Sequence, residues 1–226
     1  ITQPILGVVP YEDNLDLIDL NTEGRYKSAL ESTVVNINSL QVNENKKTQI
    51  IALTSPTPLN GKSTTCKTLA ESLSLLGKKV LIIDADFKRG GLGKDLNISS
   101  ISEKTFFNIS STNLDKYRLT DNLYLIPRVK GLANSFQFIY SQRYPEVLED
   151  LSKVFDYIIF DTAPLLSVAD TSIILQKADI NIMIIRHEVN KIAEIKQTIN
   201  MFNQIDVPLD GFIYNAYAKP TGYYGY

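Results

Sequence analysis

The sequence predicts an α/β fold in which helices cover both faces of a doubly wound, mostly parallel sheet. Two observations lead to this prediction. Short apolar runs alternate with longer amphipathic segments, which is the βαβ order of a parallel sheet with right-handed crossovers. Several of these runs contain no polar residue, as expected for strands buried on both faces. With 226 residues, of which 44% are hydrophobic, the chain is long enough for one such domain.

The expected elements follow from these patterns. Strands are expected in six apolar runs, at 50–53, 80–84, 123–126, 157–161, 180–185 and 212–214. Helices are expected at about 24–40, 62–76, 144–155, 168–177 and 190–204, and Gly77 serves as the C-cap of the second. The first 14 residues contain two prolines and predict an extended connector. We therefore divide the chain into a connector (1–23), a single domain (24–213) and a tyrosine-rich tail (214–226).

The composition argues against several classes of protein. A net charge of −2 gives no support to nucleic-acid binding. The single cysteine, Cys66, excludes an internal disulfide and suits a reducing compartment. No apolar run approaches the roughly 18 residues of a membrane helix, and no signal peptide opens the chain. Because the sequence starts at Ile1 without methionine, we expect it to be a fragment of a longer protein.

The segment IIALTSPTPLNGKSTT (50–65) predicts a phosphate-binding loop, because it follows a buried strand and opens a helix. A glycine there permits close backbone approach, and the amide groups of a helix N-terminus favour phosphate oxygens. Lys62 is expected to reach the β- and γ-phosphates, and the Ser63 hydroxyl to bind Mg²⁺. The loop departs from the usual pattern at its entry, where Pro56 replaces the first glycine. The predicted nucleotide-binding residues are Asn60, Gly61, Lys62, Ser63 and Thr64. Together they indicate a fold of the P-loop NTPase type.

Aspartates end two of the expected strands, Asp84 and Asp86 in VLIIDADFKRG and Asp161 in YIIFDTAP. Parallel sheets bind ligands at the carboxyl ends of their strands. A carboxylate after four apolar residues is costly unless it is paired, hydrogen-bonded or near a metal. Mg²⁺ bound with a nucleotide would satisfy that requirement, so we expect Asp161 to hold the metal directly or through water.

The loop, the DADFKRG segment and YIIFDTAP resemble, in order and spacing, the bacterial tyrosine kinases of capsule and exopolysaccharide assembly. The tail GFIYNAYAKPTGYYGY is similar to their C-terminal tyrosine cluster, and PILGVVP resembles the segment that joins their second membrane helix to the kinase domain. The resemblance implies the cytoplasmic kinase domain of an inner-membrane polysaccharide co-polymerase whose membrane and periplasmic region is missing here. It further implies that the substrate is ATP, that the cofactor is Mg²⁺ and that the protein forms a homo-oligomer. The implied partners are a tyrosine phosphatase and the polysaccharide assembly machinery, and nucleic acid is not among them.

The resemblance also implies roles for individual residues. Asp84 or Asp86 would accept the proton of the acceptor tyrosine. We favour Asp84 for this role, and Asp86 for holding the metal together with Ser63 and Asp161. Asn215 would contact adenine, because related domains place an asparagine after their last strand. The expected phosphate acceptors, modified by a neighbouring subunit, are Tyr217, Tyr223, Tyr224 and Tyr226. Tyr214, in contrast, is expected in the core, because it follows a buried strand.

Two departures from the family pattern bear on these expectations. Lys88 stands where the family usually has arginine, which keeps the charge but loses the bidentate geometry. The family's ring-assembly helix carries Glu and two Arg at intervals of three residues, and here these positions are Ser28, Glu31 and Val34. Oligomerisation through that helix would therefore be absent or rebuilt.

Two other functions stay open at this point. The chain could be an ATP-driven switch of the partitioning-ATPase class, although that class has a lysine where this chain has Thr57. It could also be a nucleotide-binding regulatory module without turnover. His187 is the lone histidine and is given no role, and Cys66 is expected to pack in the core.

Overall fold

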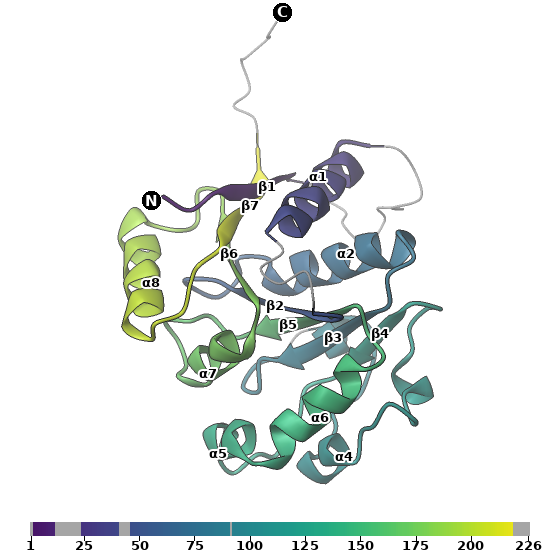
Figure 1. Cartoon of the computed structure of the whole chain (residues 1–226). Helices are drawn as coiled ribbons and strands as arrows, with labels where there is room; N and C mark the ends of the chain where they lie inside the picture. The colour runs from purple at the N-terminus through teal and green to yellow at the C-terminus, as the bar shows by residue number, and fades with distance from the viewer. Residues whose placement is uncertain (1, 12–23, 41–45, 91, 219–226) are drawn as a thin grey trace, which may run out of the picture.

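The structure, a computed structural model, describes residues 2–11, 24–40, 46–90 and 92–218, and over these residues one parallel sheet runs through the centre (Figure 1). The strand order is β1-β7-β6-β2-β5-β3-β4. All six neighbouring pairs are parallel. The strands span Ile5–Pro10 (β1), Gln49–Thr54 (β2), Val80–Ala85 (β3), Leu123–Ile126 (β4), Tyr157–Thr162 (β5), Ile180–Arg186 (β6) and Gly211–Tyr217 (β7). The predicted doubly wound α/β class is confirmed.

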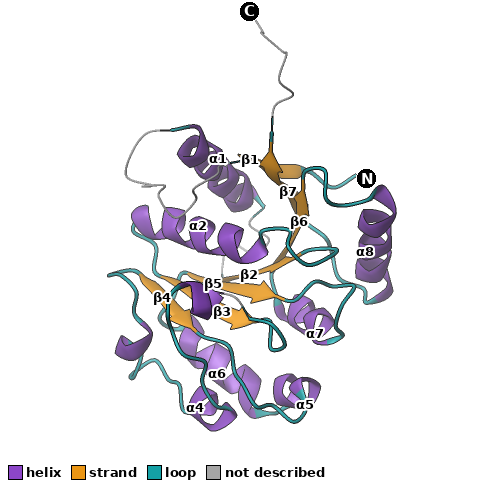
Figure 2. Ribbon diagram, turned by 180° about the vertical axis from the view of Figure 1, so that it is seen from behind, coloured by secondary structure: helices purple, strands orange, loops and turns teal. Residues whose placement is uncertain are grey.

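Helices cover both faces of this sheet (Figures 1 and 2). One face packs against α1 (Arg25–Ser39) and α2 (Lys62–Leu75), and the short helix α3 (Leu92–Asp95) lies beside α2. The opposite face packs against α4 (Glu103–Phe107), α5 (Ser135–Tyr140), α6 (Arg143–Ser152), α7 (Asp170–Lys177) and α8 (Ile192–Gln204). A 3-10 turn, η2 (Asp115–Tyr117), precedes β4. The result is a single three-layer domain.

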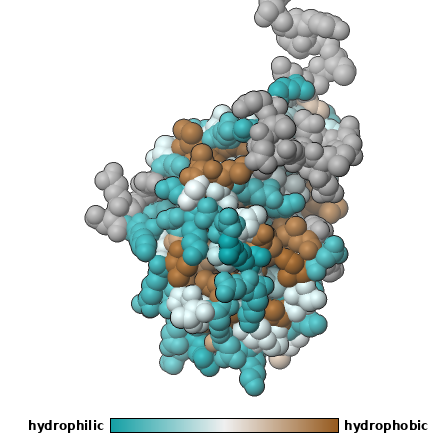
Figure 3. Space-filling model, turned by 90° about the vertical axis from the view of Figure 1, so that its right-hand side faces the viewer, coloured by the Kyte–Doolittle hydropathy of each residue, from teal (hydrophilic) through white to brown (hydrophobic). Residues whose placement is uncertain are grey.

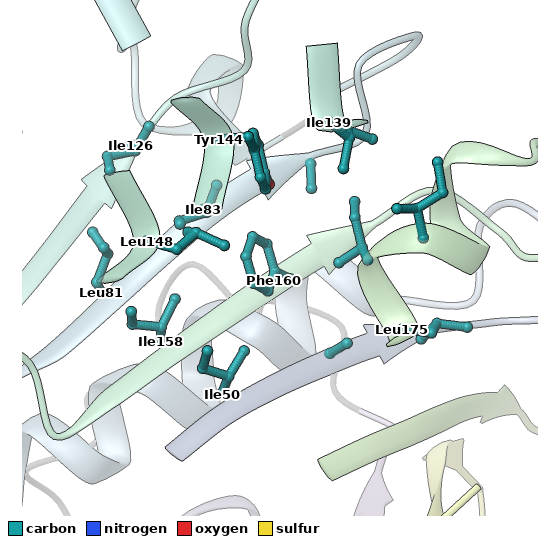
Figure 4. Packing of buried hydrophobic residues seen from close by; sticks show 14 of the residues in the cluster. Ile50, Leu81, Ile83, Ile126, Ile139, Tyr144, Leu148, Ile158, Phe160 and Leu175 are labelled. Atoms are coloured by element: carbon teal, nitrogen blue, oxygen red, sulfur yellow. The ribbon is translucent and has the colours of Figure 1, made fainter. Parts of the chain in front are cut away.

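Successive residues of the central strands serve opposite faces of the sheet. In β2, Ile50 and Ala52 belong to the core under α4–α8, whereas Ile51 and Leu53 belong to the core under α1 and α2. This alternation is the two-residue period of a strand. Figure 4 shows the first of these cores, where Phe160 of β5 lies among side chains of the neighbouring strands and helices. Burial on both sides explains why these strands are apolar at nearly every position.

An aromatic cluster connects the helices of the second face to the end of β3. The Phe138 ring of α5 lies 5.1 Å from Phe106, 5.4 Å from Tyr144 and 5.6 Å from Phe87 between ring centroids. All three contacts are edge-to-face, a favourable arrangement for aromatic rings. Because Phe87 follows Asp86 directly, α5 supports the segment that carries the predicted acidic residues.

The structure differs from the sequence prediction at both ends of the domain. The predicted connector contains strand β1, which pairs with β7 from Ile5–Phe212 to Pro10–Tyr217. Strand β7 extends to Tyr217, three residues beyond the predicted end, because β1 and β6 supply hydrogen-bonding partners on both sides. Helices α3, α4 and α5 were not predicted, since elements of four to six residues carry almost no periodic signal.

The α1 face meets solvent through a groove against α2. The groove has a volume of about 460 Å³, and its lining includes the exposed apolar residues Val35, Leu75 and Leu76. Figure 3, which views the right side of Figure 1, shows brown apolar groups among teal polar ones. Of the positions aligned with the family's ring-assembly helix, Ser28 and Glu31 are exposed on α1, whereas Val34 is buried. Among the described residues, no helix has the length and apolarity needed to cross a bilayer.

Candidate active site

The phosphate loop connects the end of β2 to the start of α2, as the sequence predicts. Helix α2 begins at Lys62, and Gly61 before it has φ 81° and ψ 22°, in the left-handed region. The Thr65 amide donates to the Gly61 carbonyl at 2.9 Å, which closes the first turn of the helix. The free amides of this turn are available for phosphate oxygens. Ser63 and Thr64, the other predicted members, lie partly exposed in the same turn.

Gly61 cannot be replaced without conflict, because Asn215 lies against its backbone. A Cβ placed on Gly61 would stand 2.1 Å from the Asn215 side-chain nitrogen. That nitrogen donates to the Asn60 carbonyl oxygen at 3.0 Å. The residue predicted to contact adenine is therefore placed next to the phosphate loop and holds its backbone. Its contact with adenine stays a prediction.

Two aspartates lie side by side at the carboxyl edge of the sheet. Asp84 of β3 and Asp161 of β5 occupy paired positions and are 2% and 1% exposed. Burial, reinforced by the negative charge of Asp161, raises the pKa of Asp84 to about 7. The Asp84 Oδ1 atom accepts from the Asp86 amide at 3.3 Å. Its Oδ2 atom is buried and has no hydrogen-bond partner in the part of the chain that the structure describes.

Lys62 completes this charged group. It is only 8% exposed, and burial lowers the pKa of its ammonium group. The negative charges of Asp161 and Asp86 oppose this shift, which places both carboxylates within electrostatic range of Lys62. The structure thus brings together Lys62, Asp84, Asp86 and Asp161, the predicted catalytic and metal-binding residues at the sheet edge.

Asp86 differs from the other two carboxylates because it organises a turn. Its Oδ1 atom accepts from the Arg89 amide at 2.9 Å and from the Lys88 amide at 3.2 Å. The side chain is partly exposed, and Lys88 and Arg89 are exposed. Its negative charge acts on Lys62 at the start of α2, so its position is compatible with the metal-side role that the sequence suggests.

Arg128, which was not singled out from the sequence, lies beside Asp84. It follows β4, and its Nη1 donates to the Lys88 carbonyl at 3.0 Å. Its positive charge lowers the pKa of Asp84, against the larger effect of burial. Gly90 permits the approach, since a Cβ there would lie 2.4 Å from Arg128 Cδ. Asp84 and Arg128 line a cavity of about 350 Å³. A basic residue directly after the apolar run LYLIP was the available sequence signal.

The last described residues form an aromatic group at the end of β7. The Tyr214 hydroxyl lies 2.5 Å from His187 Nδ1, and the Tyr217 ring lies 5.4 Å from the His187 ring. Tyr214 and Tyr217 are both partly buried. The predicted acceptors Tyr223, Tyr224 and Tyr226 lie outside the described residues. Tyr217 is described as a strand residue, and its role as an acceptor stays a prediction.

The site residues fit a magnesium nucleotide. Oxygen ligands are what Mg²⁺ prefers, and three carboxylates, those of Asp84, Asp86 and Asp161, gather at this edge of the sheet, the first and last of them buried. Gly61 keeps the loop backbone free of a side chain where phosphates would approach, and a buried lysine follows it directly. The carboxylates and the lysine have opposite charges and lie at one edge of the sheet, so a cation and an anion could be bound there together.

Comparison with known proteins agrees with this geometry. The AAA domain family matches residues 48–211. The chain is 34% identical over 181 residues to the tyrosine-protein kinase ptk of Acinetobacter johnsonii, covering 79% of this chain and 25% of that protein. It is 32% identical over 191 residues to the tyrosine-protein kinase CpsD of Streptococcus pneumoniae, covering 76% of this chain and 84% of that protein.

Among solved structures, the BceF tyrosine kinase domain has a TM-score of 0.76 at 28% identity, and the match covers 94% of this chain and 93% of that one. The chain spans about a quarter of the length of the ptk protein but most of CpsD. The fold, the phosphate loop and the paired aspartates are thus found in a chain similar to these kinases over most of its length. The protein belongs to the bacterial tyrosine kinases, within the AAA domain family.

Proposed function

We propose that this chain transfers the γ-phosphoryl group of ATP to tyrosine, and that the acceptors are the tyrosines of its own C-terminal segment. The observation that carries the proposal is the pair Asp84 and Asp161, buried side by side on neighbouring strands. They lie at the carboxyl edge of the sheet, where the phosphate loop follows β2. A buried pair of carboxylates beside a buried lysine costs stability unless a ligand compensates it. Magnesium and nucleotide phosphates are the ligand class that supplies both charges.

The chemical step requires an acceptor for the tyrosine proton. The tyrosine oxygen forms a bond to the γ-phosphorus while the bond from that phosphorus to the bridging oxygen breaks, and ADP leaves. A tyrosine hydroxyl has a pKa near 10, so a nearby carboxylate must take its proton as the bond forms. Asp84 is suited to this role, since its pKa of about 7 makes it a better base than an exposed aspartate.

Other residues would bind and orient the reactants. Lys62 would contact the β- and γ-phosphates, and the amides at the start of α2 would bind phosphate oxygens. Ser63, Asp86 and Asp161 would hold magnesium, which when bound neutralises negative charge on the phosphates. Arg128 lines the same cavity as Asp84, where its positive charge would attract an anionic group or a group that accepts a hydrogen bond.

We further propose that transfer occurs between copies of the chain, and that the chain works as the cytoplasmic domain of an inner-membrane polysaccharide co-polymerase. The proposal is supported by the similarity to tyrosine-protein kinases over 79% and 76% of the chain. A tyrosine phosphatase and the polysaccharide assembly machinery would be its partners. Because Val34 is buried and Ser28 is uncharged, contact between copies would not use the charged helix of the family.

The decisive experiment incubates the protein with labelled ATP and Mg²⁺ and then maps phosphopeptides. We expect phosphotyrosine at Tyr223, Tyr224 and Tyr226, lost in Lys62→Met and in a chain that lacks the last four residues. Lys62→Met with an intact tail should be labelled when mixed with an active chain that lacks the tail. Free phosphate without phosphotyrosine would indicate an ATPase switch, and neither product would indicate a regulatory module.

A further inference from the structure

The turn between β6 and α8 contacts the phosphate loop through Asn190. The Asn190 Nδ2 atom donates to the Thr57 hydroxyl at 2.9 Å. The Asn60 amide also bonds to Asn190, and Asn60 is completely buried. Asn190 and Thr57 lie 133 residues apart in the sequence, so this contact depends on the folded sheet. Asn190 lies outside the loop pattern that predicts nucleotide binding.

The orientation of the Asn190 amide is fixed by its own turn. Its Oδ1 atom accepts from the Arg186 backbone amide at 2.9 Å. Because an oxygen must face that N–H group, the nitrogen of the side chain is directed at the phosphate loop. The same Oδ1 atom also accepts from the Asn60 side-chain nitrogen, and the Thr57 hydroxyl donates to the Asn60 side-chain oxygen at 3.2 Å. Asn60 thus ties the loop to itself as well as to the turn.

The phosphate loop has a reason to need such support from outside. Its first glycine is replaced by Pro56, and Leu59 has φ 64°, a left-handed conformation that is unfavourable for a bulky residue. The Leu59 side chain is 83% exposed, so its own packing does not hold that conformation. Instead, Arg186 Nη1 donates to the Leu59 carbonyl at 3.0 Å. The strained part of the loop is thus held by hydrogen bonds from the β6–α8 turn.

We infer that Asn190 is a positioning residue for the nucleotide phosphates. It acts through Thr57 and Asn60, which precede Gly61 and Lys62, and keeps the loop amides in the arrangement that binds phosphate oxygens before the nucleotide arrives. The inference deepens the proposed function and rests on it for the identity of the ligand. It assigns to the β6–α8 turn a role in binding the phosphates of the nucleotide. The turn has no role in binding adenine or the acceptor tyrosine.

Removal of this amide should therefore weaken the binding of phosphates selectively. Asn190→Ala leaves Thr57 and the buried Asn60 without their partner, and the loop can then adopt other conformations. The loss of hydrogen bonds to a buried polar group corresponds to about a tenfold loss of affinity. Adenosine lacks phosphates, so its affinity should change by less than about twofold if the loop alone is affected.

The experiment compares dissociation constants for ATP, ADP and adenosine by calorimetry. Besides Asn190→Ala, it includes Thr57→Val, the double variant and Asn200→Ala, a matched control at an exposed position of α8. We expect both single variants to bind ATP and ADP more weakly, the double variant to bind them no more weakly than Asn190→Ala alone, and the control to match the parent.

A second variant, Asn190→Ser, keeps an oxygen for the Arg186 amide but is too short to reach Thr57. It should show the same loss with an unchanged melting temperature.

The inference fails if Asn190→Ser binds ATP as the parent does. It also fails if adenosine loses affinity by the same factor as ATP, because that result describes a general loss of structure. The readout is binding and does not require turnover. A parent that binds ATP but makes no phosphotyrosine would contradict the proposed function and still leave the comparison at Asn190 decisive.

Discussion

Asp84 and Asp161 lie directly opposite each other on the parallel strands β3 and β5, and both carboxylates are buried. Two negative charges at paired positions of neighbouring strands repel each other, and burial removes the water that would screen them. This pair of residues therefore lowers the stability of the folded protein. That effect makes the site measurable without an activity assay.

The first prediction concerns the pH dependence of stability. The pKa of Asp84 is about 7 in the folded protein, above its ordinary value of 3.8, so the folded state binds the proton more tightly than the unfolded state does. The free energy of unfolding should then fall as the pH rises from about 4 to 7, by as much as about 4 kcal/mol from this one group. In Asp84→Asn that contribution is absent.

The measurement is urea denaturation of the parent and of Asp84→Asn between about pH 4 and pH 8, without nucleotide or magnesium. The variant should gain stability over the parent toward the alkaline end, although it loses kinase activity. Asp121→Asn, an exposed carboxylate just before β4, serves as control and should follow the parent. Parallel pH curves for parent and Asp84→Asn would contradict the assigned pKa.

The second prediction concerns Asp161 and magnesium. Asp161→Asn keeps the shape of the side chain but removes one ligand charge, so the magnesium dependence of ATP binding should shift to concentrations roughly tenfold higher or more. The same substitution removes a charge that raises the pKa of Lys62. Magnesium titrations of ATP binding test this, and curves that superimpose on those of the parent would place Asp161 outside the metal site.

The third prediction uses two glycines with nearly the same backbone conformation. Gly61 has φ 81° and Gly77 has φ 78°, but only Gly61 has Asn215 against its α-carbon. Alanine at either position should cost about 1–2 kcal/mol of stability, because left-handed backbone disfavours a side chain. Only Gly61→Ala should also abolish ATP binding, and adding Asn215→Ala should relieve the clash and restore part of it. Equal ATP affinities in the two single variants would contradict the close approach.

The fourth prediction concerns Cys66. The thiol is fully buried on α2, and burial together with the charges of Asp161 and Asp84 raises its pKa well above the ordinary value. The thiolate is the reactive form, so a disulfide reagent should leave the native protein unmodified and react at once after unfolding in urea. Modification of the native protein at the rate of a free thiol would contradict the prediction, because it would show that Cys66 on α2 is accessible to the reagent without unfolding.

Strands buried on both faces could be predicted well from the sequence. The run at 80–84 becomes Val80–Ala85, since apolar residues must fill both layers. The terminal strand β1 could not be recognised in the same way. It contains Pro10, and Ile5 and Val8 are exposed, so its apolar pattern matches neither a buried strand nor a helix. Its identity as a strand depends on β7, which follows about 200 residues later.

The residues of the candidate site also differ in how well the sequence predicts them. Gly61, Lys62 and the aspartates at strand ends could be predicted because each has a local signature, an apolar strand followed directly by the polar group. Asn190 has no such signature, and Arg128, although it follows the apolar run LYLIP, has nothing in its local sequence that indicates its partner. They reach the site through the order in which β6 and β4 are placed in the sheet, which the local sequence does not specify.

The pairing of β1 with β7 also has a mechanical consequence. The strands are parallel, and the first residue of β1 lies at one end of the ladder while the last residue of β7 lies at the other. A force that separates these two points loads the hydrogen bonds between the strands in shear, all together, and cannot open them one after another. The edge of the sheet should therefore resist tension between the start of β1 and the end of β7 far better than it resists peeling of either strand sideways.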